Sequence, residues 1–101
     1  MDPAASLEQQ AIDFARRGDF GPDAKRANEE LTQLAPANPG AWTRLARCRM
    51  AVGQLDAATA ALESALALNP QNTIASSLQL EVTRQRVRLA ASIPVEKKKR
   101  R

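Results

Sequence analysis

The residues able to do acid–base, nucleophilic or metal chemistry are few in this chain of 101 residues. It has no His, no Tyr, no glycine-rich phosphate loop and no Cys–His pair. Adjacent Glu29 and Glu30 point about 100° apart on a helix, which indicates a solvated surface and not an acid–base couple. Asp13, Glu63 and Glu81 each stand alone on a predicted helical surface. The sequence therefore predicts that this protein is no enzyme and binds no cofactor or metal ion.

Cys48 is the single cysteine of the chain. One cysteine excludes an internal disulfide and a cluster of zinc-binding thiolates, and no histidine is available to activate it. We expect a small, buried side chain at this position and a reducing, cytoplasmic location. The N-terminal segment has acidic Asp2 and Glu8 and no long apolar run, so we expect neither a signal peptide nor a membrane span.

Basic residues are concentrated at the C-terminus. Residues 1–83 hold seven Lys or Arg against ten Asp or Glu, net −3, whereas residues 84–101 hold eight against one, net +7. The run that could neutralise phosphates consists of Lys97, Lys98, Lys99, Arg100 and Arg101. No aromatic residue interleaves these cations to stack on bases. Binding of nucleic acid or an acidic surface by this tail is thus an alternative function, and an aid to solubility is the simpler interpretation of the run.

The elements that must position any site are predicted to be helices, because Ala and Leu dominate the composition and aromatic residues are scarce. Within residues 39–70, Trp42 and Leu45 share one helical face before Gly53. A second helical pattern follows Gly53, and the small side chain of Ala58 on its inner face lets two helix backbones approach closely. This stretch is predicted to be a helical hairpin that turns at Gly53.

The same stretch carries a longer motif. In order, the motif is Trp42-x-x-Leu45-Ala46, Ala58-x-x-x-Leu62 and Pro70. It resembles the signature of the tetratricopeptide repeat, in which Gly, an aromatic residue and Phe stand where this chain has Ala46, Arg49 and Leu62. Arg49 is the largest departure, since a large apolar side chain is expected there. The resemblance implies an all-α fold, a right-handed α-α superhelix of five helices.

A second copy of the motif lies upstream in the chain. At an offset of 35 residues Leu7 aligns with Trp42, and after a longer turn Ala24 aligns with Ala58 at an offset of 34. Asn28 stands where the second copy has a leucine, so the first copy is degenerate, as terminal repeats often are.

We expect one domain and a short tail. The predicted parts are a domain over residues 1–91, with repeat 1 at about 3–36, repeat 2 at about 37–70 and a capping helix at about 72–91, and a disordered basic tail at 92–101. The capping helix is expected to pack on the second hairpin through Ile74, Leu78, Val82 and Leu89. Leu80 and Val87, on the opposite side, are either scattered surface residues or a seam for a second copy or a partner helix.

The resemblance also implies a binding surface, because in tetratricopeptide proteins the first helix of each pair lines the concave side. The residues placed there are Glu8, Ile12 and Arg16 from the first helix, and Thr43, Arg47 and Met50 from the helix that begins at Pro39. Arg16 and Arg47 make this surface basic, whereas Ile12 and Met50 offer apolar contact.

One subgroup of the family clamps the C-terminal carboxylate of chaperone peptides with Lys and Asn side chains. Glu8 and Ile12 stand where the first helix would supply them, so we do not expect this activity. We predict a non-catalytic protein–protein interaction module that binds a peptide or partner helix in the concave groove, in an adaptor or assembly role. A solvated groove without a dedicated ligand is the alternative for this surface. Two repeats are fewer than the three or so that usually bury a continuous core, so a homodimer is a further option.

Overall fold

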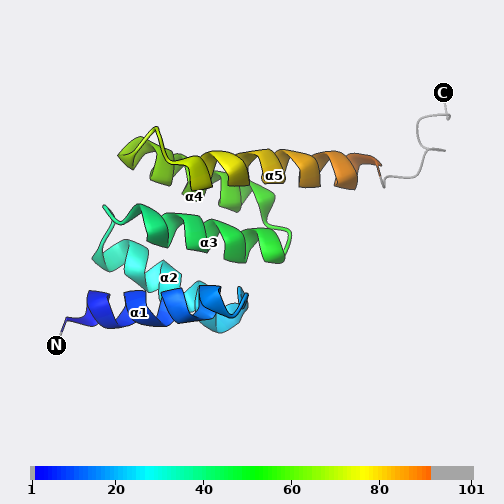
Figure 1. Ribbon diagram of the computed structural model, residues 1–101. Coiled ribbons are helices and arrows are strands. Elements are labelled where there is room, and N and C mark those ends of the chain that lie inside the picture. Colours follow the sequence, from blue (N-terminus) through cyan, green and yellow to red (C-terminus); the bar gives the residue numbers. More distant parts are fainter. Residues whose placement is uncertain (1, 92–101) are drawn as a thin grey trace, which may run out of the picture.

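The computed structural model describes residues 2–91 and, over that range, contains five helices and no strand. They are α1 (Pro3–Arg16), α2 (Pro22–Leu34), α3 (Pro39–Ala51), α4 (Leu55–Leu68) and α5 (Thr73–Ala91). The pairs α1/α2 and α3/α4 form two hairpins stacked side by side, and α5 packs on the second (Figure 1). This arrangement confirms the predicted all-α superhelix. The predicted disordered tail, residues 92–101, lies outside the described residues.

Helices α3 and α5 begin in the same way. The side chain of Asn38 accepts a hydrogen bond from the backbone N–H of Ala41 at 3.3 Å, and that of Asn72 accepts one from Ala75 at 3.1 Å. Both asparagines are N-caps, and both alanines are fully buried. The two caps are 34 residues apart, the offset that also relates parts of the two repeats. The capping helix α5 is therefore in register with α3, as the first helix of a third copy would be.

Glycines end the first helix of each hairpin. Gly18 and Gly53 have φ angles of 70° and 79°, in the left-handed region that residues with a Cβ atom rarely adopt. Both follow their helix within two residues, as left-handed C-terminal caps do. The predicted turn at Gly53 is confirmed.

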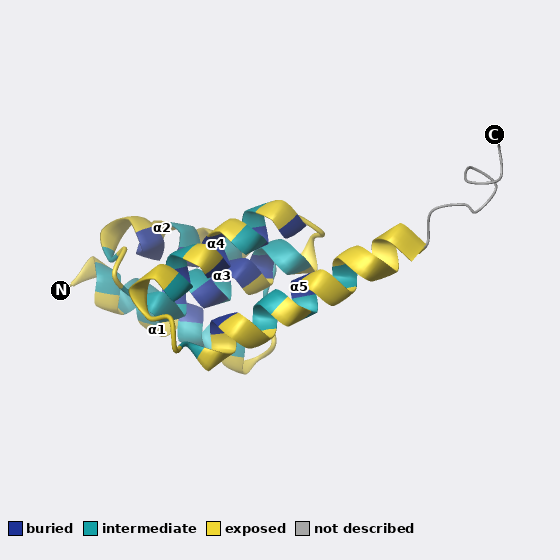
Figure 2. Cartoon of the chain, turned by 90° about the horizontal axis from the view of Figure 1, so that it is seen from above, coloured by how far each residue is buried: buried dark blue, intermediate teal, exposed yellow. Residues whose placement is uncertain are grey.

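The core is built mainly from alanines and leucines of α3, α4 and α5. Its buried residues are Ala46, Leu55, Ala58, Ala61, Leu62, Ala65, Ala75 and Val82, and the half-buried Trp42, Met50, Leu66 and Leu78 pack against them. Figure 2 shows the buried positions between the helices and a largely exposed C-terminal half of α5. The alanines allow close approach of the helices, and the leucines fill the remaining volume.

Two side chains at the edge of this core make polar contacts. The indole N–H of Trp42 donates to the carbonyl oxygen of Pro36 at 2.8 Å. Arg49, the largest departure from the repeat signature, donates from Nη1 to the carbonyl oxygen of Ala57 at 2.9 Å. Arg49 thus joins α3 to the first turn of α4 through a hydrogen bond, where an aromatic side chain would do so by packing.

The predicted packing stripe of α5 is partly wrong. Val82 is buried and Leu78 packs against the core, but Ile74 and Leu89 are 55% and 56% exposed. Ala75, which is fully buried, takes the inner position instead of Ile74. Near its other end, α5 runs past the hairpin (Figure 2).

Candidate functional site

A hollow of about 320 Å³ lies between α1, α3 and α5. Its lining residues are Ile12, Ala15 and Arg16 from α1, Gly40, Thr43, Arg44 and Arg47 from α3, and Ile74 from α5. These are the first helices of the two hairpins together with the capping helix, so the hollow belongs to the surface predicted to be concave. It brings together four of the six residues predicted for that surface, namely Ile12, Arg16, Thr43 and Arg47.

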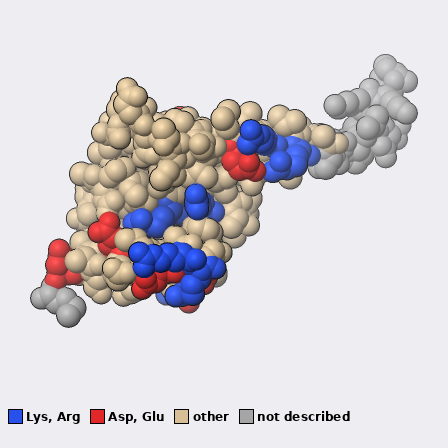
Figure 3. All heavy atoms as spheres, in the orientation of Figure 1, with Lys and Arg blue, Asp and Glu red and all other residues tan. Residues whose placement is uncertain are grey.

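The hollow is basic. Figure 3 shows basic side chains over α1 and α3 on this face, with acidic side chains beside them over α1. Arg16 is exposed, and its nearest carboxylate is that of Asp13, at 3.9 Å. Arg47 is also exposed, and its guanidinium carbon lies 5.5 Å from the centre of the Phe20 ring, a cation–π contact. None of the lining residues is acidic.

Arg44 lies at the back of the hollow and is half-buried. Its Nε donates to the side-chain oxygen of Asn28 at 3.1 Å, and the Asn28 amide donates to the carbonyl oxygen of Ala24 at 2.9 Å. Nη2 of Arg44 is buried without a hydrogen-bond partner among the described residues. Burial lowers the pKa of Arg44, and the charge of Glu8 raises it in part.

This network is not predicted by the sequence. Its one available signal was the polar residue Asn28 at the place that Leu62 holds in the second repeat. The structure shows why a polar residue suits that place: Asn28 is 1% exposed and supplies the acceptor that Arg44 needs.

Three of the six predicted groove residues make contacts within the structure, and of these three only Thr43 also lines the hollow. Glu8 accepts a hydrogen bond from the side chain of Asn38 at 2.8 Å, which joins α1 to the start of α3. Thr43 is 6% exposed and donates to the carbonyl oxygen of Gly40 at 3.0 Å. Met50 packs against the core and lines a different hollow, near the end of α3. Whether any of the six residues contacts a partner stays a prediction.

Comparison with protein families supplies the identity of the fold. A family model described as tetratricopeptide repeat matches residues 22–81. The chain belongs to the tetratricopeptide repeat family. Such repeats generally mediate protein–protein interaction and are typically non-catalytic. A search of curated proteins found no match to this chain.

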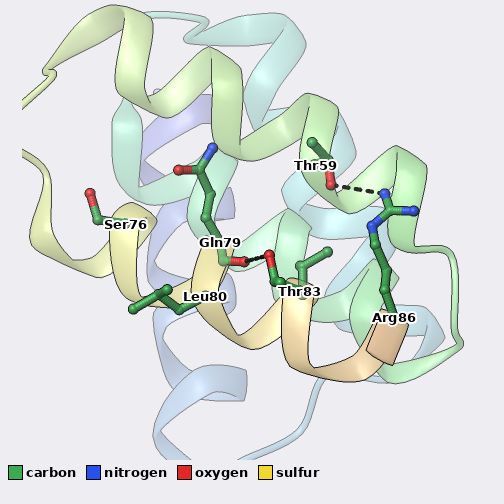
Figure 4. A pocket seen from close by; sticks show the side chains of 7 residues that line it. Thr59, Ser76, Gln79, Leu80, Thr83 and Arg86 are labelled. Carbon is green, nitrogen blue, oxygen red and sulfur yellow. Dashed lines mark hydrogen bonds between the residues drawn. The ribbon is translucent and has the colours of Figure 1, made fainter. Parts of the chain in front are cut away.

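A second hollow, of about 560 Å³, is lined by residues of α5 and by Thr59 of α4 (Figure 4). At an offset of 34, four of its lining residues correspond to signature positions of the tetratricopeptide repeat: Ser76, Gln79, Leu80 and Thr83 stand for Trp42, Leu45, Ala46 and Arg49. These are the positions at which the first helix of a repeat meets its second helix. At these positions of α5, hydroxyl and amide side chains replace most of the apolar side chains of the repeat. Water can therefore form hydrogen bonds with this face of α5.

Side chains from α4 and α5 also close one end of this second hollow. Arg86 donates to Asp56 at 2.7 Å and to the hydroxyl of Thr59 at 3.4 Å, the latter drawn in Figure 4. Leu80 and Val87 are 60% and 62% exposed. Contact of this pair with a second copy stays a prediction.

The other arginines of α5 are paired with a single carboxylate. Arg84 and Arg88 contact Glu81 at 3.4 and 3.1 Å. The hydrogen bond from Arg88, followed by that from Arg84, holds the pKa of Glu81 below its ordinary value. The single carboxylate therefore balances one of these two positive charges. The basic run at residues 97–101 lies outside the described residues, so its role stays a prediction.

The described residues offer little for other kinds of site. Cys48 is 1% exposed, and burial raises the pKa of its thiol, which opposes use as a nucleophile. No group of three or more His, Cys, Asp or Glu residues is arranged to hold a metal ion in residues 2–91. Over the same residues, every helix is too short or too polar to cross a bilayer.

Proposed function

We propose that this tetratricopeptide repeat protein is a non-catalytic interaction module that binds a peptide or a helix of a partner protein in an adaptor or assembly role. The observation that carries the proposal is the hollow shared by α1, α3 and α5. Residues from three helices that are separate in the sequence line one depression, which suits a ligand that lies across the helices. A cytoplasmic setting is part of the proposal.

The walls of this hollow are supported by the core, which favours binding without a large conformational change. Ala41 and Ala46 of α3 are fully buried, so the helix that supplies half of the lining residues is fixed by packing. Ile74 lies in the first turn of α5, and the side chain of Asn72 caps the N-terminus of this helix. Preformed walls of this kind reduce the entropy that binding must offset.

The test is selection of ligands from a library of random peptides displayed on phage, with the intact chain as bait. The selected peptides are then titrated into isotopically labelled protein, and the changes in backbone amide resonances are mapped. We expect the largest changes at Ile12, Arg47 and Ile74. The matched control is the opposite surface of the second hairpin, represented by Glu63 on α4, which is exposed.

Two results would contradict the proposal. One is that no peptide is enriched over the phage background. The other is that the resonance changes centre on α2 and α4 and leave the hollow unaffected.

The basic tail supports a second candidate function, binding of nucleic acid or of an acidic surface. The observation in its favour is the separation of charge, with five consecutive cations at residues 97–101 beyond a body of net −3. Retention of the intact chain on DNA or RNA at low salt is compared with that of a chain lacking residues 95–101. Equal retention of the two would exclude the tail as the binding element.

A further inference from the structure

The charges in the hollow between α1, α3 and α5 are all of one sign. Arg16, Arg44 and Arg47 line it, and no Asp or Glu does. The body of the chain, residues 1–83, is net negative. The positive charge of the hollow is therefore a local arrangement and not a consequence of overall composition, and it favours an anionic ligand there.

The two arginines at the rim are available to such a ligand. The side chain of Arg16 is 74% exposed, and its contact with Asp13 is long, so this surface pair contributes little that a ligand would have to replace. Arg47 makes no ion pair in the described part of the chain. Its stacking on Phe20 leaves the N–H groups at the guanidinium edge free to point at a carboxylate.

The third arginine adds positive charge from behind. Arg44 is half-buried, and one of its terminal nitrogens has no hydrogen-bond partner among residues 2–91. The carboxylate that acts on it is that of Glu8, which already accepts a hydrogen bond from Asn38. A partly buried cation without a close counter-ion is unfavourable, and a ligand anion in the hollow would offset this cost.

The hollow also has apolar walls. Ile12 and Ala15 line it from α1, and Ile74, 55% exposed, lines it from α5. At about 320 Å³ it stands at the lower end of the range of ligand pockets, about 300 to 1,000 Å³. This size suits one or two side chains of a peptide and not a large cofactor.

We infer that the ligand of this hollow is an acidic peptide segment in which Asp or Glu stands beside Leu, Ile or Val. The carboxylate meets Arg16 and Arg47, and the aliphatic side chain packs against Ile12 and Ile74. Charge selects the segment, and apolar contact adds affinity. The inference rests on the proposed function, since it names the ligand of the same site.

A protein ligand is favoured over a nucleic acid because the aromatic rings are already engaged. Phe14 and Phe20 each lie beneath a guanidinium, those of Arg17 and Arg47, with the cation 5.0 and 5.5 Å from the ring centre. Trp42 is half-buried against the core. A guanidinium thus occupies one face of each phenylalanine ring, and the core engages Trp42, so these rings are less accessible to bases than the stacking platforms that single-strand binding commonly uses.

The test compares peptides selected on the intact wild-type chain with those selected on Arg47→Glu. Arg47 is exposed, so the substitution leaves the fold intact, which circular dichroism checks. We expect the wild type to enrich Asp or Glu next to aliphatic residues, and Arg47→Glu to lose this enrichment. A synthetic peptide chosen on the wild type should bind Arg47→Glu at least about tenfold more weakly. The affinity of this peptide for the wild type should also fall when its Asp or Glu residues are replaced by Asn or Gln.

The matched control is Arg26→Glu, which changes charge equally at an exposed arginine of α2 outside the hollow. We expect it to change affinity by less than about twofold at physiological salt, where distant surface charges are screened. Groove-binding peptides without acid enrichment would overturn the inference and leave the proposed function standing. A short polyuridine RNA that displaces the peptides from the wild type and loses affinity in Arg47→Glu would also overturn it. Absence of any groove-binding peptide would instead contradict the proposed function itself.

Discussion

The contact between Asn28 and Arg44 predicts a specific pattern of stability in a double-mutant cycle. Asn28→Leu makes the first repeat resemble the second, which has Leu62 at this place. In this structure the change removes the acceptor of the Arg44 Nε donor, 3.1 Å away. Arg44→Met alone removes the donor and leaves the buried amide oxygen of Asn28 without its partner.

The magnitudes follow from the cost of an unpaired polar group. A buried donor or acceptor that loses its partner costs about 1 to 3 kcal/mol, and charged groups cost more. Arg44 is only half-buried and can partly recover water, so we expect each single substitution to lower the free energy of unfolding by about 2 kcal/mol. Part of this loss in Asn28→Leu is offset by burial of the leucine side chain. The double variant leaves neither group unpaired, so it should lie within about 1 kcal/mol of the wild type.

The assay is urea unfolding followed by far-ultraviolet circular dichroism, with the free energy extrapolated to water. The control pairs Asn28→Leu with Arg88→Met, because Arg88 lies on α5 and contacts Glu81 instead. That pair should be additive within about 0.5 kcal/mol. Additivity of Asn28→Leu and Arg44→Met to the same precision would refute the coupling, and a gain in stability from Asn28→Leu alone would show that Arg44 does not need its acceptor.

Three further predictions concern the packing, a turn and the thiol. Leu62→Ala should lower the free energy of unfolding by about 2 to 5 kcal/mol in urea titrations, because Leu62 is fully buried. The control, Leu68→Ala, changes a 43% exposed position and should lower it by less than about 1 kcal/mol. Similar losses from the two substitutions would contradict the packing. Gly53→Ala should cost about 1 kcal/mol in thermal unfolding, since φ is 79° and an added Cβ meets no atom within 4 Å, and a stabilising effect would show that the turn is not left-handed in solution. Cys48 should react with a disulfide reagent only after unfolding by urea, because the thiol is 1% exposed and burial raises its pKa. The raised pKa also means that the neutral thiol favours the folded state below the ordinary thiol pKa of about 8.5 and that this contribution is lost as pH rises above it; rapid labelling of the native chain at neutral pH would contradict the burial.

The sequence by itself determined the helices, their turns and the family. Trp42, Leu45, Ala58 and Leu62 share faces at helical spacing, and Gly53 marks the turn between them, because these features depend on neighbours within a few residues of the same segment. On the same local grounds, the sequence shows no motif typical of a catalytic or metal-binding site.

Only the tertiary structure decided which face of each helix is buried against its neighbours. Ile74 turns toward the hollow, whereas Ala75 turns inward and is fully buried. Met50, which was predicted to line the groove, packs on the core instead. Arg44, which was not predicted, lines the hollow between α1, α3 and α5. These outcomes depend on the rotation and crossing angle of each helix relative to its neighbours. Helical periodicity identifies the residues that share a face, but the contacts between helices decide which face turns inward.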